Sequence, residues 1–108
     1  MIQWYVPNPT PIQAIQLTWA NWNSVCDFIG DIFSIQGFRG VYVDGDEYTD
    51  DPPLGPNNIG LLIPTLEGTM LAKANDYIVR GLKGEFYPVK PDIFEMKYRK
   101  YTGVVKGL

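Results

Sequence analysis

Residues 59–89, IGLLIPTLEGTMLAKANDYIVRGLKGEFYPV, decide the fold, because in them short apolar runs alternate with turn-forming residues. The runs are rich in β-branched and aromatic residues, which favour strands. Glu67-Gly68, Asn75-Asp76 and Gly81–Gly84 are typical turn sequences. The pattern therefore predicts an antiparallel meander with strands at 59–65, 69–73, 77–80 and 85–89.

A strand and a helix are predicted upstream of this meander. Apolar and polar residues alternate over residues 12–19, which is the period of a strand with one buried face. Residues 22–29 carry apolar side chains at helical spacing and predict a short amphipathic helix. Thr18 or Asn21 is the expected N-cap of this helix, and Gly30 is expected to end it.

Two further strands are expected at 33–36 and 38–43, where aromatic and β-branched residues dominate. Residues 90–94 predict a tight turn or a single helical turn, since proline is favoured at a first helical position. Residues 96–101 predict a last strand. The expected fold class is α+β, with a mostly antiparallel sheet or small open barrel and one short amphipathic helix packed on it.

The composition fits one small domain over residues 1–108. With 45% hydrophobic and 19% charged residues, the chain can bury a core without metals or disulfides. Residues 1–11 contain Pro7, Pro9 and Pro11 and predict an extended arm. Residues 44–58, DGDEYTDDPPLGPNN, predict an exposed acidic loop.

The residues that the chain lacks disfavour several chemistries. Histidine, the commonest general base and metal ligand, is absent, and the single cysteine is Cys26. Cys26 lies on the predicted apolar face of the helix, where no base is available to activate it. The acidic loop lacks the glycine and the glutamate that a calcium-hand loop requires. We therefore expect no enzymatic activity, no cofactor and no metal.

The sequence also predicts a compartment. No apolar run is long enough to span a bilayer, and the first residues do not resemble a signal peptide. A single cysteine agrees with a reducing environment. A soluble, cytoplasmic protein without a membrane partner is expected.

Charge is unevenly distributed along the chain. Residues 1–72 hold one basic and eight acidic residues, whereas residues 73–108 hold eight basic and four acidic ones. Such parts either attract each other, within the fold or between subunits, or leave a basic region that attracts an anion. Because a short β-rich chain has strand edges to protect, we also expect a homo-oligomer.

The later part of the chain resembles a family of small phage and prophage proteins. The matching stretches are residues 65–70 (TLEGTM), residues 75–94 (NDYIVRGLKGEFYPVKPDIF) and Tyr98, and Ala14-Ile15-Gln16 with the following helix resembles the family's opening. Ala74-Asn75-Asp76 departs from the Pro-Gly-Asp of many relatives, and the prolines of the arm and the acidic loop look particular to this chain. The resemblance implies a phage or prophage origin and an accessory gene product of no established activity.

Two regions are candidate binding sites. The basic and aromatic C-terminal region would hold a small anionic, nucleotide-like ligand, through the donors and stacking faces of Arg80, Lys83, Tyr87, Lys90 and Tyr98. The acidic loop would instead mimic nucleic-acid phosphates toward a host protein, through Asp44, Asp46, Glu47, Asp50 and Asp51. Direct nucleic-acid binding is not expected, because Glu85 and Pro88 interrupt the pattern of an RNA-recognition strand.

These observations predict a phage-encoded accessory binding protein that acts stoichiometrically. Its expected role is host takeover or defence evasion, either by inhibiting a bacterial protein or by sequestering a nucleotide-like signal. The alternative is a structural or virion-associated accessory protein.

Overall fold

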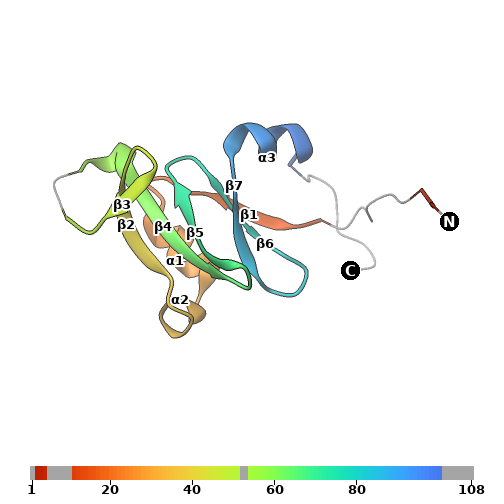
Figure 1. Ribbon diagram of the computed structural model, residues 1–108, viewed down its shortest axis with the longest axis horizontal. Coiled ribbons are helices and arrows are strands. Elements are labelled where there is room, and N and C mark those ends of the chain that lie inside the picture. The colour runs from red at the N-terminus through yellow and green to blue at the C-terminus, as the bar shows by residue number, and fades with distance from the viewer. Residues whose placement is uncertain (1, 5–10, 52–53, 101–108) are drawn as a thin grey trace.

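The strands predicted after Ile59 form the centre of the domain. A computed structural model describes residues 2–4, 11–51 and 54–100 and has the predicted α+β architecture (Figure 1). Its elements, in chain order, are β1 (Gln13–Gln16), α1 (Trp22–Ile29), α2 (Ile32–Ile35), β2 (Arg39–Asp44), β3 (Glu47–Thr49), the 3-10 turn η1 (Pro56–Asn58), β4 (Ile59–Thr65), β5 (Gly68–Lys73), β6 (Tyr77–Arg80), β7 (Phe86–Val89) and α3 (Pro91–Lys97).

The strands form two antiparallel sheets. One has the order β3-β2-β4-β5 and the other the order β1-β6-β7. Strand β7 contacts both β4 and β5, so the two sheets lie against each other, and one of them is curled into a half-barrel. The helix α3 lies beside β7 at the other end of the domain from the β2–β3 hairpin (Figure 1).

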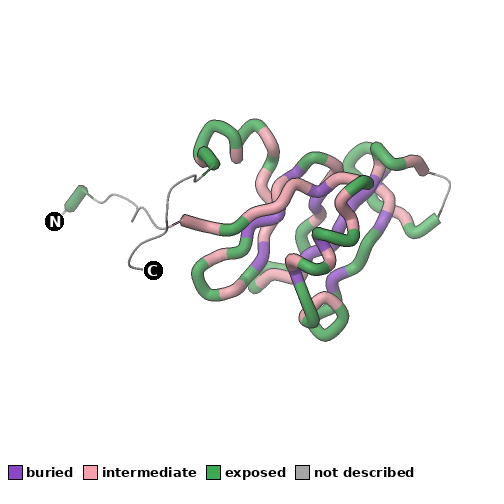
Figure 2. Tube along the Cα trace, turned by 180° about the vertical axis from the view of Figure 1, so that it is seen from behind, coloured by how far each residue is buried: buried purple, intermediate pink, exposed green. Residues whose placement is uncertain are grey.

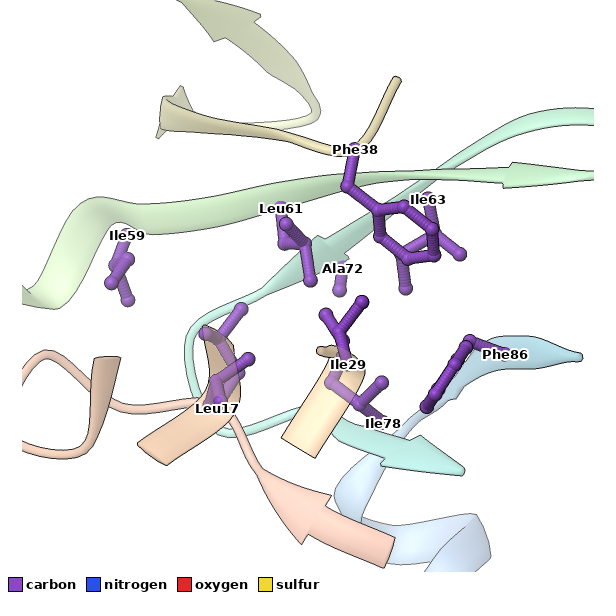
Figure 3. Packing of buried hydrophobic residues seen from close by; sticks show 10 residues of the cluster. Leu17, Ile29, Phe38, Ile59, Leu61, Ile63, Ala72, Ile78 and Phe86 are labelled. Carbon is purple, nitrogen blue, oxygen red and sulfur yellow. The ribbon is translucent and has the colours of Figure 1, made fainter. Parts of the chain in front are cut away.

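The core lies between the sheets and α1. Side chains alternate across a strand, and those of Ile59, Leu61 and Ile63 on β4 project from the side of the strand that faces Leu17 and Ile29 (Figure 3). Figure 2 shows that buried positions concentrate in the middle of the strands, while the turns are exposed. The complete cluster is Leu17, Val25, Ile29, Phe38, Ile59, Leu61, Ile63, Ala72, Ile78 and Phe86.

The predicted helix is confirmed at residues 22–29, with one difference at its start. Gly30 ends it with a positive φ of 78°, which glycine adopts readily, and its N–H donates to the Cys26 carbonyl at 2.9 Å. Asn21 occupies the N-cap position, but its side chain does not cap the helix. Its carboxamide accepts from the Thr18 N–H and donates to the Gln16 carbonyl, which fixes the loop between β1 and α1.

The strand predicted at 33–36 is wrong, because these residues lie in or beside the single turn of helix α2. A short apolar run does not distinguish a strand from a helix. The local geometry is decided by Gly30 and Gly37, whose φ angles of 78° and 83° reverse the chain on either side. Between them, the Gln36 N–H donates to the Ile32 carbonyl at 2.8 Å.

The last predicted strand is also wrong over its described residues. Helix α3 continues to Lys97, since Pro91 begins it while Asp92 and Lys97 suit the charges of its two ends. Residues 98–100 have no regular structure, and Tyr101 lies outside the described residues. Within the described residues, every helix is too short to cross a membrane.

The acidic segment 44–58 is not a simple loop. Its first residues form a hairpin in which Asp44 pairs with Glu47 across a two-residue turn, and Gly45 has a φ of 65° there. The segment ends in η1. The predicted extended arm falls largely outside the described residues, which include only residues 2–4 and Pro11 of it.

Candidate functional site

An apolar groove of about 240 Å³ lies between the start of α1 and the face of β2 and β4. Three aromatic side chains and one carboxylate line it, together with two glycines and two aliphatic residues: Trp19, Trp22, Tyr42, Asp50, Gly40, Gly60, Val41 and Ile59. Only Asp50 was among the candidate binding residues of the sequence analysis. The groove therefore comes chiefly from residues that the sequence did not single out.

Gly40 allows the groove to form. The indole of Trp22 lies so close to the strand that a Cβ at Gly40 would approach its ring to 2.8 Å. The ring of Phe33 supports Trp22 from another side by an edge contact, with centroids 6.1 Å apart. A glycine inside a strand often marks such a close approach, and this was the signal in the sequence that could have revealed the site.

Tyr42 lies two residues beyond Gly40 and on the same face of β2, since side chains alternate along a strand. Two residues of strand span about 6.7 Å. Carbon atoms in contact are about 3.5 Å apart, so one planar group between two walls needs about 7 Å. The backbone spacing between Gly40, which Trp22 covers, and Tyr42 is therefore close to the thickness of one flat group.

Asp50 supplies the polar part of the groove. Its Oδ2 accepts a hydrogen bond from Nη1 of Arg39 at 2.8 Å, and the guanidinium of Arg39 lies 5.8 Å from the ring centre of Tyr48. Both side chains of this ion pair are more than half exposed. Within the described residues, the Oδ1 atom of Asp50 has no hydrogen-bond partner.

The other predicted acidic residues surround Asp50 in different ways. Asp44 and Glu47 face each other across the hairpin, and alternation places both on the face that carries Tyr42. Asp46 instead binds Nζ of Lys73 at 2.5 Å, and this bond and the charge of Lys73 hold the pKa of Asp46 below its usual value.

Asp51 makes a local backbone contact, in which its N–H donates to Oγ1 of Thr49 at 3.1 Å. Asp50 alone of the five acidic residues lines the groove. Asp44 and Glu47 add negative charge to the same face of the hairpin.

The predicted basic residues do not converge on one site. Arg80 and Lys83 lie at the β6–β7 turn, where Arg80 packs 5.9 Å from the ring centre of Phe86. Lys90 precedes α3 at the opposite end of β7, about 13 Å away along the strand. A second hollow, of about 310 Å³, includes Arg80 but none of the other four predicted ligand residues.

The predicted stacking residues Tyr87 and Tyr98 contact each other and helix α3. Burial raises the pKa of Tyr87, and the neighbouring Tyr98 contributes in the same direction. Tyr98 packs on Phe94 with centroids 5.0 Å apart, and Phe94 stacks on Tyr77 at 3.9 Å. This row of rings attaches α3 to β6 and β7.

No group of three or more acidic or cysteine side chains is placed to hold a metal ion in the part of the chain that the structure describes. Burial, together with the charge of Asp27, raises the pKa of Cys26 and keeps its thiol protonated. What the groove offers is aromatic surface and one carboxylate.

Comparison with known proteins found no family model, curated protein or solved structure that matches the chain.

Proposed function

We propose that this protein acts stoichiometrically by holding a segment of a partner protein in the groove between Trp22 and Tyr42. The observation that supports this function is the joining of aromatic walls to the carboxylate of Asp50. Aromatic side chains that line a concave surface are typical anchors of protein interfaces. A carboxylate at the same place favours a partner with positive charge.

The acidic hairpin supports the same kind of partner. Asp44 and Glu47 lie on the face that carries Tyr42, so they extend negative charge beyond Asp50. Such a surface attracts a basic protein and can compete with nucleic-acid phosphates for it. The resemblance of residues 65–98 to small phage proteins makes a bacterial host protein the natural target, in host takeover or defence evasion.

Sequestration of a nucleotide-like signal is the less supported function. The aromatic groove could accept a base, but a phosphate also needs cationic donors. Arg39 is the basic residue beside the groove and is paired with Asp50. Arg80, Lys83 and Lys90 are distributed over two ends of β7.

The test is affinity capture of the tagged chain from bacterial cells, followed by mass spectrometry of bound proteins and small molecules. One variant neutralises the hairpin face (Asp44→Asn, Glu47→Gln, Asp50→Asn), and its matched control neutralises the basic residues (Arg80→Gln, Lys83→Gln, Lys90→Gln). We expect the first variant to lose a stoichiometric protein partner and the second to retain it.

If the first variant instead retains its protein partner and the second variant loses a bound nucleotide, the function is sequestration of a signal and not the binding of a protein. Recovery of the chain as a component of purified virions would support the structural alternative. Retention of the partner by both variants would show that neither charged region carries binding.

A further inference from the structure

We propose that the groove binds an arginine side chain of the partner, with its guanidinium between Trp22 and Tyr42 and hydrogen-bonded to Asp50. This inference rests on the proposed function and names the group that the groove selects. Three independent features of the groove support it: the thickness of the space, the free carboxylate oxygen and the surrounding charge.

The first feature is the thickness of the space. Two residues of β2 separate Gly40, which Trp22 covers, from Tyr42, and this backbone spacing is close to the thickness of one flat group. The guanidinium of arginine is planar, weakly hydrated and stacks on aromatic faces. The ammonium of lysine is compact and strongly hydrated, so it would contact the walls less completely and lose more water.

The second feature is the free oxygen of Asp50. Its Oδ2 already binds the guanidinium of Arg39, which also lies over the ring of Tyr48. Arg39, Asp50 and Tyr48 thus already combine a guanidinium, a carboxylate and an aromatic ring, as an arginine bound in the groove would do with Asp50 and the groove walls. The Oδ1 atom makes no hydrogen bond within the described residues and can accept one from a second guanidinium.

This oxygen also argues against uncharged occupants. A proline or an aromatic side chain would fill the flat space, but it would cover Asp50 without offering a donor to Oδ1. Leaving a carboxylate oxygen desolvated and unpaired is unfavourable. Arginine fills the space and satisfies the oxygen at the same time.

The third feature is the charge around the groove. Two guanidinium groups that share one carboxylate would repel each other unless further negative charge lies nearby. Asp44 and Glu47 lie on the groove side of the hairpin and provide it. Both side chains of the Arg39–Asp50 pair are more than half exposed. The pair can therefore change its geometry to admit a second guanidinium at little cost in free energy.

The test is a titration of the full chain with the capped peptides acetyl-Gly-Arg-Gly-amide and acetyl-Gly-Lys-Gly-amide, observed by NMR. The chain has three tryptophans, whose indole N–H signals report separate places. Trp19 and Trp22 line the groove, whereas Trp4 is 99% exposed and serves as an internal control. We expect saturable shifts of the Trp19 and Trp22 signals, an unmoved Trp4 signal, and arginine binding about tenfold tighter than lysine.

Three variants sharpen this test. Asp50→Asn should weaken binding of the arginine peptide about tenfold and abolish its advantage over lysine. Asp31→Asn removes the same charge at an exposed position between α1 and α2, outside the groove, and should change neither. Arg39→Gln frees both oxygens of Asp50, so it should raise the affinity for the arginine peptide more than the affinity for the lysine peptide.

Equal affinity for the two peptides, or arginine binding that survives Asp50→Asn, would overturn the assignment of arginine. The same titration with acetyl-Gly-Trp-Gly-amide distinguishes a failure of the arginine assignment from a failure of the proposed function. If that peptide saturates the Trp22 signal and the arginine peptide does not, the groove is a protein-binding site with another anchor. If no peptide shifts the signal and the hairpin variant still captures its partner, the proposed function fails as well.

Discussion

At the scale of single residues, Gly40 has the largest consequence for the site. Its missing side chain lets the indole of Trp22 lie against β2, and both residues line the groove. The residue is exposed and carries no chemistry of its own. Its importance comes only from the ring that approaches it.

Gly40→Ala is therefore expected to displace Trp22 and to destabilise the fold by about 1 to 3 kcal/mol, the usual effect of overpacking. The matched control is Gly55→Ala, since a Cβ at Gly55 would meet nothing within 4 Å and its φ of −91° suits alanine. Denaturant unfolding of both variants measures the difference. Equal stability of the two would mean that Trp22 moves aside freely and that Gly40 does not shape the groove.

At the scale of elements, the sequence-based predictions were most accurate where the tertiary contacts of a segment agree with its local preference for helix or strand. Strand β4 was predicted with its observed bounds, because its apolar run is long, β-rich and ended by a clear turn. The residues at α2 are rich in aromatic and β-branched side chains, which favoured a strand, and two glycines outside the run decided the outcome.

The candidate site was predicted less well than the fold, for a physical reason. Trp22 was assigned to the apolar face of a helix, and its ring does pack toward Phe33. The groove exists because that helix meets β2 at Gly40, which is a contact between segments 18 residues apart. Asp50 was found because carboxylates are visible in a sequence, whereas the walls beside it depend on how the elements pack.

The attachment of α3 is the second feature at this scale that can be tested. Tyr87 has a raised pKa in the fold, so the folded state retains its phenolic proton at a pH where the unfolded chain has lost it. The stability that this group contributes is complete below the ordinary pKa of 10.0 and decreases as the pH rises through the raised value.

We therefore expect α3 to detach in alkaline solution as Tyr87 ionises. Tyr87→Phe keeps the ring, removes the ionising group, and should reduce the loss of stability above pH 10.0. Tyrosinate absorbance together with melting temperatures across this range measures it, and Tyr42→Phe, far from α3, is the control. An identical alkaline loss in the wild type and Tyr87→Phe would place its origin in another group.

At the scale of the whole molecule, the acidic and the basic part of the sequence partly neutralise each other within the fold. Asp46 of the acidic hairpin binds Lys73, the first residue of the basic part. Asp44 and Glu47 remain on the groove side of the hairpin, and Arg80 and Lys83 lie at the β6–β7 turn, away from it (Figure 1). The charges that this ion pair leaves uncompensated are thus separated across the domain.

Such a separation can be compensated between molecules, which agrees with the homo-oligomer that the sequence predicts. Light scattering should then show association at low ionic strength that salt reverses, because attraction between exposed charges is screened beyond about 10 Å at 0.1 M salt. Reversing Arg80 and Lys83 to Glu should abolish this association, while Lys73→Gln, which removes a cation already paired with Asp46, should affect it less. A monomer at low salt and high concentration would show instead that the acidic face is left open, and the groove beside it would then be free for a partner of another sequence.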